Sequence, residues 1–384
     1  MDYIEDMTNA NHLILAMKRV EKASGWKDSA QKVLINRLKV TRELRAAVRE
    51  GSYRQGDGAT FTLCENGHTR LVKALCTKDI IVQHTLADTV LFPNLLKYLI
   101  HDNGASVRGK GISFTRRRFE QHLRKFYRRH GRDGYIMLID FRKFFDNIRH
   151  DRLDEKFHEK FGDWRLREFM LRLFEKYRVD VSYSDNEHII DEVFNSLDYQ
   201  KIDKALLTGK RYMAKSLGIG APISQIAGIF FPTEIDTFCK TVKGCKYYGV
   251  YMDDRYVIHH DKKFLQKLLE DICRIAKKLG LHVNRRKTRI VKLTRGFTFL
   301  KTRYIVTDTG RLVKKIPPDV VTRQRRKMKK LAAFVVRGEM AIEDFKNQYR
   351  SWKGDKKKYN AHHTLCGMDK LYWRLLKWIT KPIP

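Results

Sequence analysis

Apolar positions recur along most of the chain with the spacing of helices. Between residues 8 and 50 an apolar face repeats every three or four positions and basic residues fill the opposite face, which predicts helix. The same spacing predicts further helices at 79–101, 114–130, from about 151, 222–240, 262–280, 318–338 and 340–375. The pattern fails at 179–205, which is acidic and is expected to be an irregular insertion.

Short apolar or alternating runs bounded by turn residues predict strands between these helices. We expect a hairpin at 61–75 with its turn at 65–67, and strands or hairpins at 135–141, 246–260, 281–293 and 297–306. From residue 135 onward the order is strand, helix, helix, hairpin, helix, strand. That order predicts an α+β fold in which an antiparallel sheet is backed by helices on one face.

The 384-residue chain is strongly basic, with 79 Lys and Arg against 44 Asp and Glu and a formal net charge of +35. This balance favours a polyanionic partner, nucleic acid first. No apolar run reaches the roughly 18 residues of a membrane span, and the N-terminus lacks the pattern of a signal peptide. The six cysteines show no C-x-x-C spacing, so we expect reduced thiols in a cytoplasmic protein without membrane contact.

Two adjacent acids, Asp253 and Asp254, end the segment YYGVYMDD at the turn of a predicted hairpin. Asp140 ends the buried strand YIMLID, and adjacent strands of one antiparallel sheet would bring these carboxylates together. Carboxylates so placed favour a hard divalent cation, Mg²⁺ first, and two such ions serve in-line phosphoryl transfer. An acidic pair alone is typical of an ordinary hairpin tip. Three features together favour a metal site: the aromatic Tyr251 before the pair, the apolar strand that ends in Asp140, and the basic chain.

Several short motifs occur in the order in which reverse transcriptases carry them. LIDFRKFFDNI (138–148) and YMDD (251–254) resemble motifs A and C of that family. SVRGKGI (106–112), NRRKT (284–288) and GFTFLKTRY (296–304) resemble its fingers segment, its motif D and its primer-grip hairpin. The chain is therefore similar to bacterial reverse transcriptases of the YMDD type.

This resemblance implies a right-hand polymerase fold with fingers, a palm of antiparallel sheet backed by helices, and a helical thumb. The implied boundaries are an N-terminal helical extension at 1–60, fingers at 61–134, a palm at 135–310 and a thumb region at 311–384. A further fingers or insertion segment would interrupt the palm at about 151–215.

The resemblance also implies the metal ligands. Asp140 and Asp253 would bind two Mg²⁺ ions, with Mn²⁺ as a substitute, and Asp254 would have a supporting role. The backbone carbonyl of Phe141 would complete a metal shell. Tyr251 would lie with Met252 under the primer terminus.

The resemblance also implies which residues hold the incoming nucleotide. Phe145 stands where the family has an aromatic gate that clashes with a ribose 2′-hydroxyl, although the adjacent Phe144 leaves open that Phe145 is a core residue. Arg108 and Lys110 would hold the triphosphate, because a guanidinium fork and an ammonium both suit phosphate oxygens, although generic nucleic-acid binding is the alternative. Lys287 would lie near the leaving pyrophosphate.

Motif B departs from the usual family pattern. The chain reads IGAPISQ at 219–225, with Ile219 in place of the usual Gln and Gln225 in place of the usual Pro. This version resembles the reverse transcriptases of diversity-generating retroelements, and it also occurs among related antiphage-defence enzymes. Loss of a polar contact at Ile219 would relax selection of the incoming base, unless the residue only packs.

The C-terminal helices combine basic and aromatic residues. TRQRRKMKKLAAF (322–334) is expected to be a thumb helix whose Arg323, Arg326 and Lys330 face the duplex backbone. Trp352 lies among lysines, a combination that suits nucleic acid, and is equally suited to anchor one helix against another.

We therefore expect an RNA-directed DNA polymerase that adds deoxynucleoside triphosphates to a DNA or RNA primer on an RNA template, with a cognate structured noncoding RNA as partner. One alternative is an antiphage-defence reverse transcriptase that makes cDNA from an associated noncoding RNA. Another is an RNA-binding scaffold with a polymerase fold. An RNA-dependent RNA polymerase is disfavoured by Phe145. An accessory protein or a homo-oligomer stays open. The acidic insertion could dock on a basic partner, on a second protomer or on the chain's own basic fingers, and we expect the last.

Overall fold

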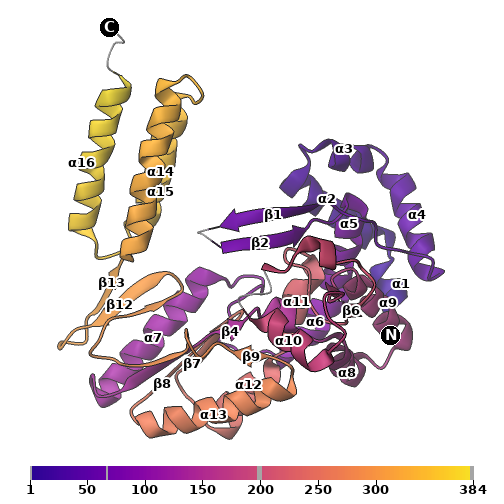
Figure 1. Cartoon of the computed structure of the whole chain (residues 1–384), viewed down its shortest axis with the longest axis horizontal. Helices are drawn as coiled ribbons and strands as arrows, with labels where there is room; N and C mark the ends of the chain where they lie inside the picture. Colours follow the sequence, from indigo (N-terminus) through magenta and orange to yellow (C-terminus); the bar gives the residue numbers. More distant parts are fainter. Residues whose placement is uncertain (1, 66–67, 197–200, 381–384) are drawn as a thin grey trace. The chain divides into compact units, whose positions relative to one another are not determined.

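In the computed structural model the described residues are 2–65, 68–196 and 201–380. They form two compact units, each assembled from three stretches of the chain. Figure 1 labels the helices and strands along the chain. Unit 1 comprises Met1–Thr115, Ile139–Arg255 and Gln266–Thr288. Unit 2 comprises Arg116–Leu138, Tyr256–Leu265 and Arg289–Pro384. The chain thus passes repeatedly between the two units.

Unit 1 is mainly helical. Its α-helices are α1 (Tyr3–Met7), α2 (Ala10–Ser24), α3 (Asp28–Ile35), α4 (Arg37–Arg49), α5 (Thr77–Leu86), α6 (Phe92–Leu95), α8 (His150–Phe161), α9 (Trp164–Glu175), α10 (Glu187–Asn195), α11 (Pro222–Phe230), α12 (Thr233–Thr237) and most of α13 (Lys262–Lys278). Short 3₁₀ or π segments are η1 (Ala87–Leu91), η2 (Leu96–Tyr98), η3 (Phe145–Asn147), η5 (Lys204–Leu206) and η6 (Phe238–Val242). The helical periodicity at 8–50 is confirmed, since α2 buries Leu13, Met17 and Val20 on one face.

One expectation within unit 1 is wrong. The acidic stretch 179–205 is not wholly irregular, because α10 lies inside it and buries Ile190 and Phe194, four residues apart on one face. Asp191 of this helix forms ion pairs with Lys215 and His282, at 2.6 and 3.5 Å. The insertion is therefore docked on basic side chains of the same unit.

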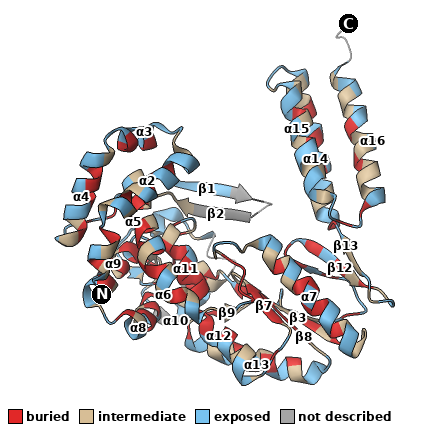
Figure 2. Cartoon of the chain, turned by 180° about the vertical axis from the view of Figure 1, so that it is seen from behind, coloured by how far each residue is buried: buried red, intermediate tan, exposed pale blue. Residues whose placement is uncertain are grey.

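The strands of unit 1 are short. They are β1 (Thr60–Glu65), β2 (His68–Lys73), β4 (Phe141–Arg142), β5 (Val179–Asp180), β6 (Tyr212–Met213), β7 (Tyr248–Tyr251) and β9 (His282–Val283). β1 and β2 pair as the expected antiparallel hairpin, while part of its predicted turn, residues 66–67, falls outside the described residues. β4 pairs with β9, and β5 with β6, both antiparallel. Figure 2 shows that β7 and α11 are almost entirely buried.

Unit 2 contains most of the remaining strands and the C-terminal helices. Its elements are α7 (Ile112–His130), β3 (Tyr135–Ile139), β8 (Asp254–His259), β10 (Arg289–Lys292), β11 (Phe297–Phe299), β12 (Thr302–Val306), β13 (Leu312–Lys315), α14 (Pro318–Val336), α15 (Ile342–Lys356) and α16 (His362–Ile379). The largest sheet has the order β10-β3-β8-β7, and the division between the units passes within β3 and β8. A second sheet has the order β11-β12-β13. These antiparallel sheets with their helices confirm the α+β fold class.

Two predicted elements of the C-terminal half are divided in the structure. The strand expected at 281–293 is interrupted between β9 and β10 by a turn at 284–288. The helix expected at 340–375 is two helices, because the chain turns at Asn360 and fastens to β13. There the backbone N–H of Asn360 donates to Lys314 O at 2.7 Å, and its side chain accepts from Lys314 N at 3.0 Å.

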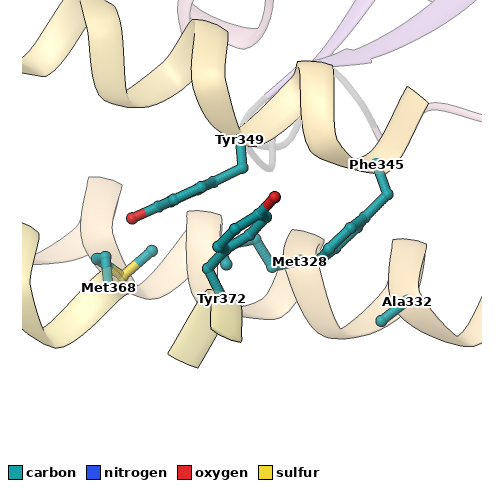
Figure 3. Close-up of a cluster of buried hydrophobic side chains, with 6 residues drawn as sticks. All are labelled: Met328, Ala332, Phe345, Tyr349, Met368 and Tyr372. Carbon is teal, nitrogen blue, oxygen red and sulfur yellow. The ribbon is translucent and has the colours of Figure 1, made fainter. Parts of the chain in front are cut away.

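The three C-terminal helices enclose a core of their own (Figure 3). It consists of Met328, Ala332, Phe345, Tyr349, Met368 and Tyr372. The Tyr349 and Tyr372 rings stack with centroids 4.5 Å apart. Trp352 is half-buried and packs against this core, as the helix-packing alternative expected. Among the described helices, none has the length and apolar character required to cross a membrane.

Candidate active site

The three acids singled out in the sequence come together in unit 1. Asp140 directly follows β3, Asp253 lies in the turn between β7 and β8, and Asp254 begins β8. Burial and the neighbouring charges of Asp253 and Asp140 raise the pKa of Asp254 to about 7. Burial is the largest cause of this shift, and the further contributions of Asp253 and Asp140 indicate that the three carboxyl groups lie close enough to repel one another.

Asp140 is held by the turn that interrupts the predicted strand at 281–293. The Asn284 side-chain amide donates to Asp140 Oδ2 at 2.9 Å, and the Asn284 backbone N–H donates to Asp140 O at 2.8 Å. The Asp140 N–H donates to Thr288 Oγ1 at 3.3 Å. Lys287 Nζ lies 4.0 Å from Asp140 Oδ2. The motif NRRKT therefore forms a turn around the acid, which is why it cannot continue as a strand.

The turn that carries Asp253 is braced from the protein interior. Met252 has a positive φ of 56°, a left-handed conformation that is strained for a residue with a side chain. Arg255, with 1% of its surface exposed, donates from Nη1 to Met252 O and to Asp253 O, both at 3.3 Å. Its guanidinium also lies 5.0 Å from the centre of the Phe141 ring.

Arg255 is itself paired with a buried acid. Its Nε donates to Asp236 Oδ1 at 3.2 Å, and the Tyr248 hydroxyl donates to the same oxygen at 2.5 Å. The charge of Asp236 raises the pKa of Arg255 and keeps the guanidinium protonated in spite of burial. Within the described structure Arg255 Nη2 and Asp236 Oδ2 have no hydrogen-bond partner. Sequence reasoning missed this pair, and the one available signal was a charged residue inside the apolar strand that follows YMDD.

The acids suit a divalent metal ion. Their carboxylate oxygens are the hard ligands that Mg²⁺ prefers, and a cation would remove the repulsion that raises the pKa of Asp254. Among residues 2–65, 68–196 and 201–380, no group of three or more His, Cys, Asp and Glu side chains is already arranged around one point as metal ligands. The Asp140 carboxylate accepts from Asn284 through Oδ2, and its second oxygen can serve as a metal ligand without loss of that bond.

Phe145 lies in the segment η3, five residues after Asp140. Its neighbour Phe144 is 4% exposed and takes the core position, whereas Phe145 is half-buried. The Phe145 ring lies against Gly228 of α11, where a Cβ atom would stand 2.8 Å from Phe145 Cε1. The absence of a side chain at Gly228 thus permits the position of this ring. The backbone is fixed as well, because Leu217 N–H donates to Phe145 O at 3.0 Å.

The loop 103–112 is anchored to the strand that precedes the acidic turn. Gly104 N–H donates to Val250 O at 3.1 Å, and Val250 N–H donates to Asp102 O at 3.0 Å. Further along the loop, the Ser106 hydroxyl donates to Gln225 Oε1 of α11 at 3.3 Å. The segments SVRGKGI and IGAPISQ are therefore in contact, as parts of one site.

The remaining predicted residues of this region differ in exposure and in hydrogen bonding. Arg108 is exposed, whereas Lys110 Nζ donates to the carbonyls of His101 and Asn103, at 2.7 and 3.2 Å. Lys287 is exposed, and Ile219, Tyr251 and Met252 are half-buried.

The predicted thumb residues lie on α14 in unit 2. Arg323, Arg326 and Lys330 are all exposed, and their spacing of three and four residues places them on one face of the helix. Arg323 forms an exposed ion pair with Asp319 at 2.6 Å. The other two cations leave this face strongly basic.

Comparisons with known proteins place the chain in a family. Its residues 67–304, more than half of the chain, match the family described as reverse transcriptase (RNA-dependent DNA polymerase). Telomerase from Candida albicans, solved in complex with the TWJ fragment of telomeric RNA, is a similar structure with 12% sequence identity and a TM-score of 0.48. That match covers 85% of this chain and 56% of the telomerase chain, so the present chain spans little more than half of its length. A comparison with curated protein sequences returns no match. With its α+β right-hand polymerase fold, the chain belongs to the reverse transcriptase (RNA-dependent DNA polymerase) family.

Proposed function

We propose that the chain is an RNA-directed DNA polymerase whose metal ligands are Asp140 and Asp253, supported by Asp254 and the Phe141 carbonyl. The observation that carries this proposal is the placement of the three acids, with Asp140 directly after β3, Asp253 in the turn between β7 and β8, and Asp254 at the start of β8, in a sheet where β3 and β8 are neighbours. Two Mg²⁺ ions, or Mn²⁺ in their place, would activate the primer 3′-hydroxyl and neutralise charge on the triphosphate when bound.

The side chains around the acids suit the remaining tasks. Arg108 and Lys287 are exposed cations that can contact phosphate oxygens, and Lys110 joins them once it releases the two carbonyls that it now binds. Phe145 would exclude a ribose 2′-hydroxyl with the ring that lies against Gly228. Tyr251 and Met252 would support the primer terminus.

The partners follow from charge and from the family. We propose that residues 1–60, 61–134, 135–310 and 311–384 act as N-terminal extension, fingers, palm and thumb. The template would be a dedicated structured noncoding RNA, held in part by the basic face of α14. Ile219 and Gln225 in motif B suit the error-prone copying of a retroelement and also antiphage defence. A template repeat with a variable copy beside the gene would distinguish the first setting from the second.

The test is primer extension by purified protein on a primed RNA template with Mg²⁺. Deoxynucleotide incorporation is expected in the wild type and at least a thousandfold less with Asp253→Asn, because loss of one ligand charge removes several kcal/mol of transition-state stabilisation. Phe145→Ala is expected to admit ribonucleotides while it retains deoxynucleotide incorporation. Unchanged incorporation by Asp253→Asn would refute the proposal.

A further inference from the structure

Unit 1 contains a cavity of about 470 Å³ that shares no lining residue with the candidate active site. It is formed by the loop that follows α4, by α9 with the turn after it, and by β6. Its volume lies within the range of small-molecule sites, roughly 300–1,000 Å³.

The cavity is strongly basic. Four of its lining residues are cations, namely Arg54, Arg172, Lys176 and Arg178, against the single acid Glu175. Burial lowers the pKa of Lys73, and repulsion by the charge of Lys176 lowers it further. An anion in the cavity would relieve this repulsion.

The cations retain capacity to bind such an anion. Arg178 donates from Nη2 to Glu175 at 2.7 Å, but its Nε is buried and has no hydrogen-bond partner within the described part of the chain. Lys176 Nζ donates to an exposed acid, Asp57, at 2.7 Å. Arg172 donates from Nη1 to the Gly51 carbonyl at 3.0 Å, which fixes it at the cavity wall. A buried guanidinium N–H without an acceptor costs free energy that a phosphate oxygen would recover.

Aromatic rings form the other part of the wall. Tyr53 is buried, donates to Asp79 at 2.5 Å, and lies 5.7 Å from the Phe169 ring, so this pair is a fixed apolar wall. Tyr212 differs because 53% of its surface is exposed. Its ring therefore offers a face on which a planar base can stack.

We propose that this cavity binds a nucleotide, with its base on Tyr212 and its phosphate on Arg178, Lys176 and Arg54. The combination of phosphate-binding cations with an exposed ring in one concave site is what points to this ligand class. The nucleotide has two sources, an unpaired residue of the RNA partner or a free mononucleotide. The RNA source rests on the proposed function, since it assumes that the chain holds an RNA template.

Photo-crosslinking tests the proposal on the full chain. The probes are 4-thiouridine monophosphate and a single-stranded RNA that carries one 4-thiouridine, each irradiated with the protein and followed by trypsin digestion. Cleavage after Arg211 and Lys215 releases residues 212–215 as a short peptide. We expect a crosslink on this peptide, and a loss of at least about fivefold with Tyr212→Ala or Arg178→Gln. Arg274→Gln on α13, an exposed cation to which no binding role is assigned, is the matched charge control and should retain the crosslink at 212–215.

The outcomes separate the two sources. A crosslink from the RNA alone assigns the site to an RNA nucleotide, and a crosslink from both probes assigns it to nucleotides in general. Absence of the crosslink with both probes, or its persistence in Tyr212→Ala and Arg178→Gln proteins that melt like the wild type, would overturn the inference. Asp253→Asn should crosslink normally. Polymerisation without the crosslink therefore refutes this site alone, and the crosslink without polymerisation refutes the proposed function alone.

Discussion

The pairing of Arg255 with Asp236 leads to the prediction that replacing the whole buried group preserves the stability of the protein but not its catalytic activity. Asp236→Asn leaves a fully buried guanidinium without a counter-charge, which costs about 3–5 kcal/mol of unfolding free energy. Replacing the whole group with apolar residues, as Asp236→Leu, Arg255→Met and Tyr248→Phe together, leaves no buried charge or hydroxyl unpaired. We expect this triple variant to be within about 2 kcal/mol of the wild type, or more stable.

The triple variant should be close to the wild type in stability but should not have its polymerase activity. The triple variant lacks the two hydrogen bonds that Arg255 donates to Met252 O and Asp253 O, both long at 3.3 Å. At about 1.5 kcal/mol each, together they offset the strain of a left-handed Met252, on the order of 1–3 kcal/mol. Without them the turn relaxes and displaces Asp253. A loss of about 3 kcal/mol corresponds to roughly a hundredfold lower kcat.

Two assays decide this prediction. Urea unfolding followed by tryptophan fluorescence gives the stability of the wild type, Asp236→Asn and the triple variant, and primer extension on an RNA template gives kcat for each. The reasoning is refuted if the triple variant is as active as the wild type, because the turn would then need no brace. It is refuted equally if Asp236→Asn unfolds at the wild-type urea concentration.

Two further predictions concern nucleotide choice and pH. Gly228→Ala should push the Phe145 ring from its place and reduce the preference for deoxynucleotides by about tenfold in kcat/KM, whereas Gly354→Ala in α15, where a Cβ meets no atom within 4 Å, should leave it unchanged. An unaltered preference in Gly228→Ala would contradict the assignment of the gate. In the metal-free protein the pKa of Asp254 is raised from 3.8 in the unfolded chain to about 7. Between these two values the folded state keeps a proton that the unfolded state has lost, so the folded state loses stability as the pH rises to about 7. Asp254→Asn should therefore raise the melting temperature at pH 8 and have little effect near pH 4, and equal effects at both pH values would show that the carboxyl is not coupled.

The acids of the site could be predicted from the sequence because their signals are local. Asp140 ends an apolar run and Asp253 lies in a short turn between two apolar runs, so adjacency in an antiparallel sheet follows from pattern alone. The α+β class and the β1–β2 hairpin followed in the same way. Asp253 and Asp140 in turn identified the family to which the chain belongs.

The supports of the acids could not be predicted, because they depend on contacts between segments distant in the chain. Asn284 reads as part of a strand, yet it leaves the strand to hydrogen-bond Asp140, 144 residues earlier. Arg255 is a single charged residue inside the apolar strand that follows YMDD, and only its burial beside Asp236 reveals its role. Lys110 illustrates the converse, since its motif predicts phosphate contact while its ammonium binds two carbonyls in the structure.

The most direct test of the central claim is to locate metal ions at the three acids. Crystals of the protein with a primed RNA template and a non-hydrolysable deoxynucleoside triphosphate, grown in Mn²⁺, would show the metal by its anomalous scattering. The account predicts anomalous peaks at about 2–2.3 Å from carboxylate oxygens of both Asp140 and Asp253, beside the triphosphate. A bound nucleotide with no anomalous peak at either carboxylate would contradict it.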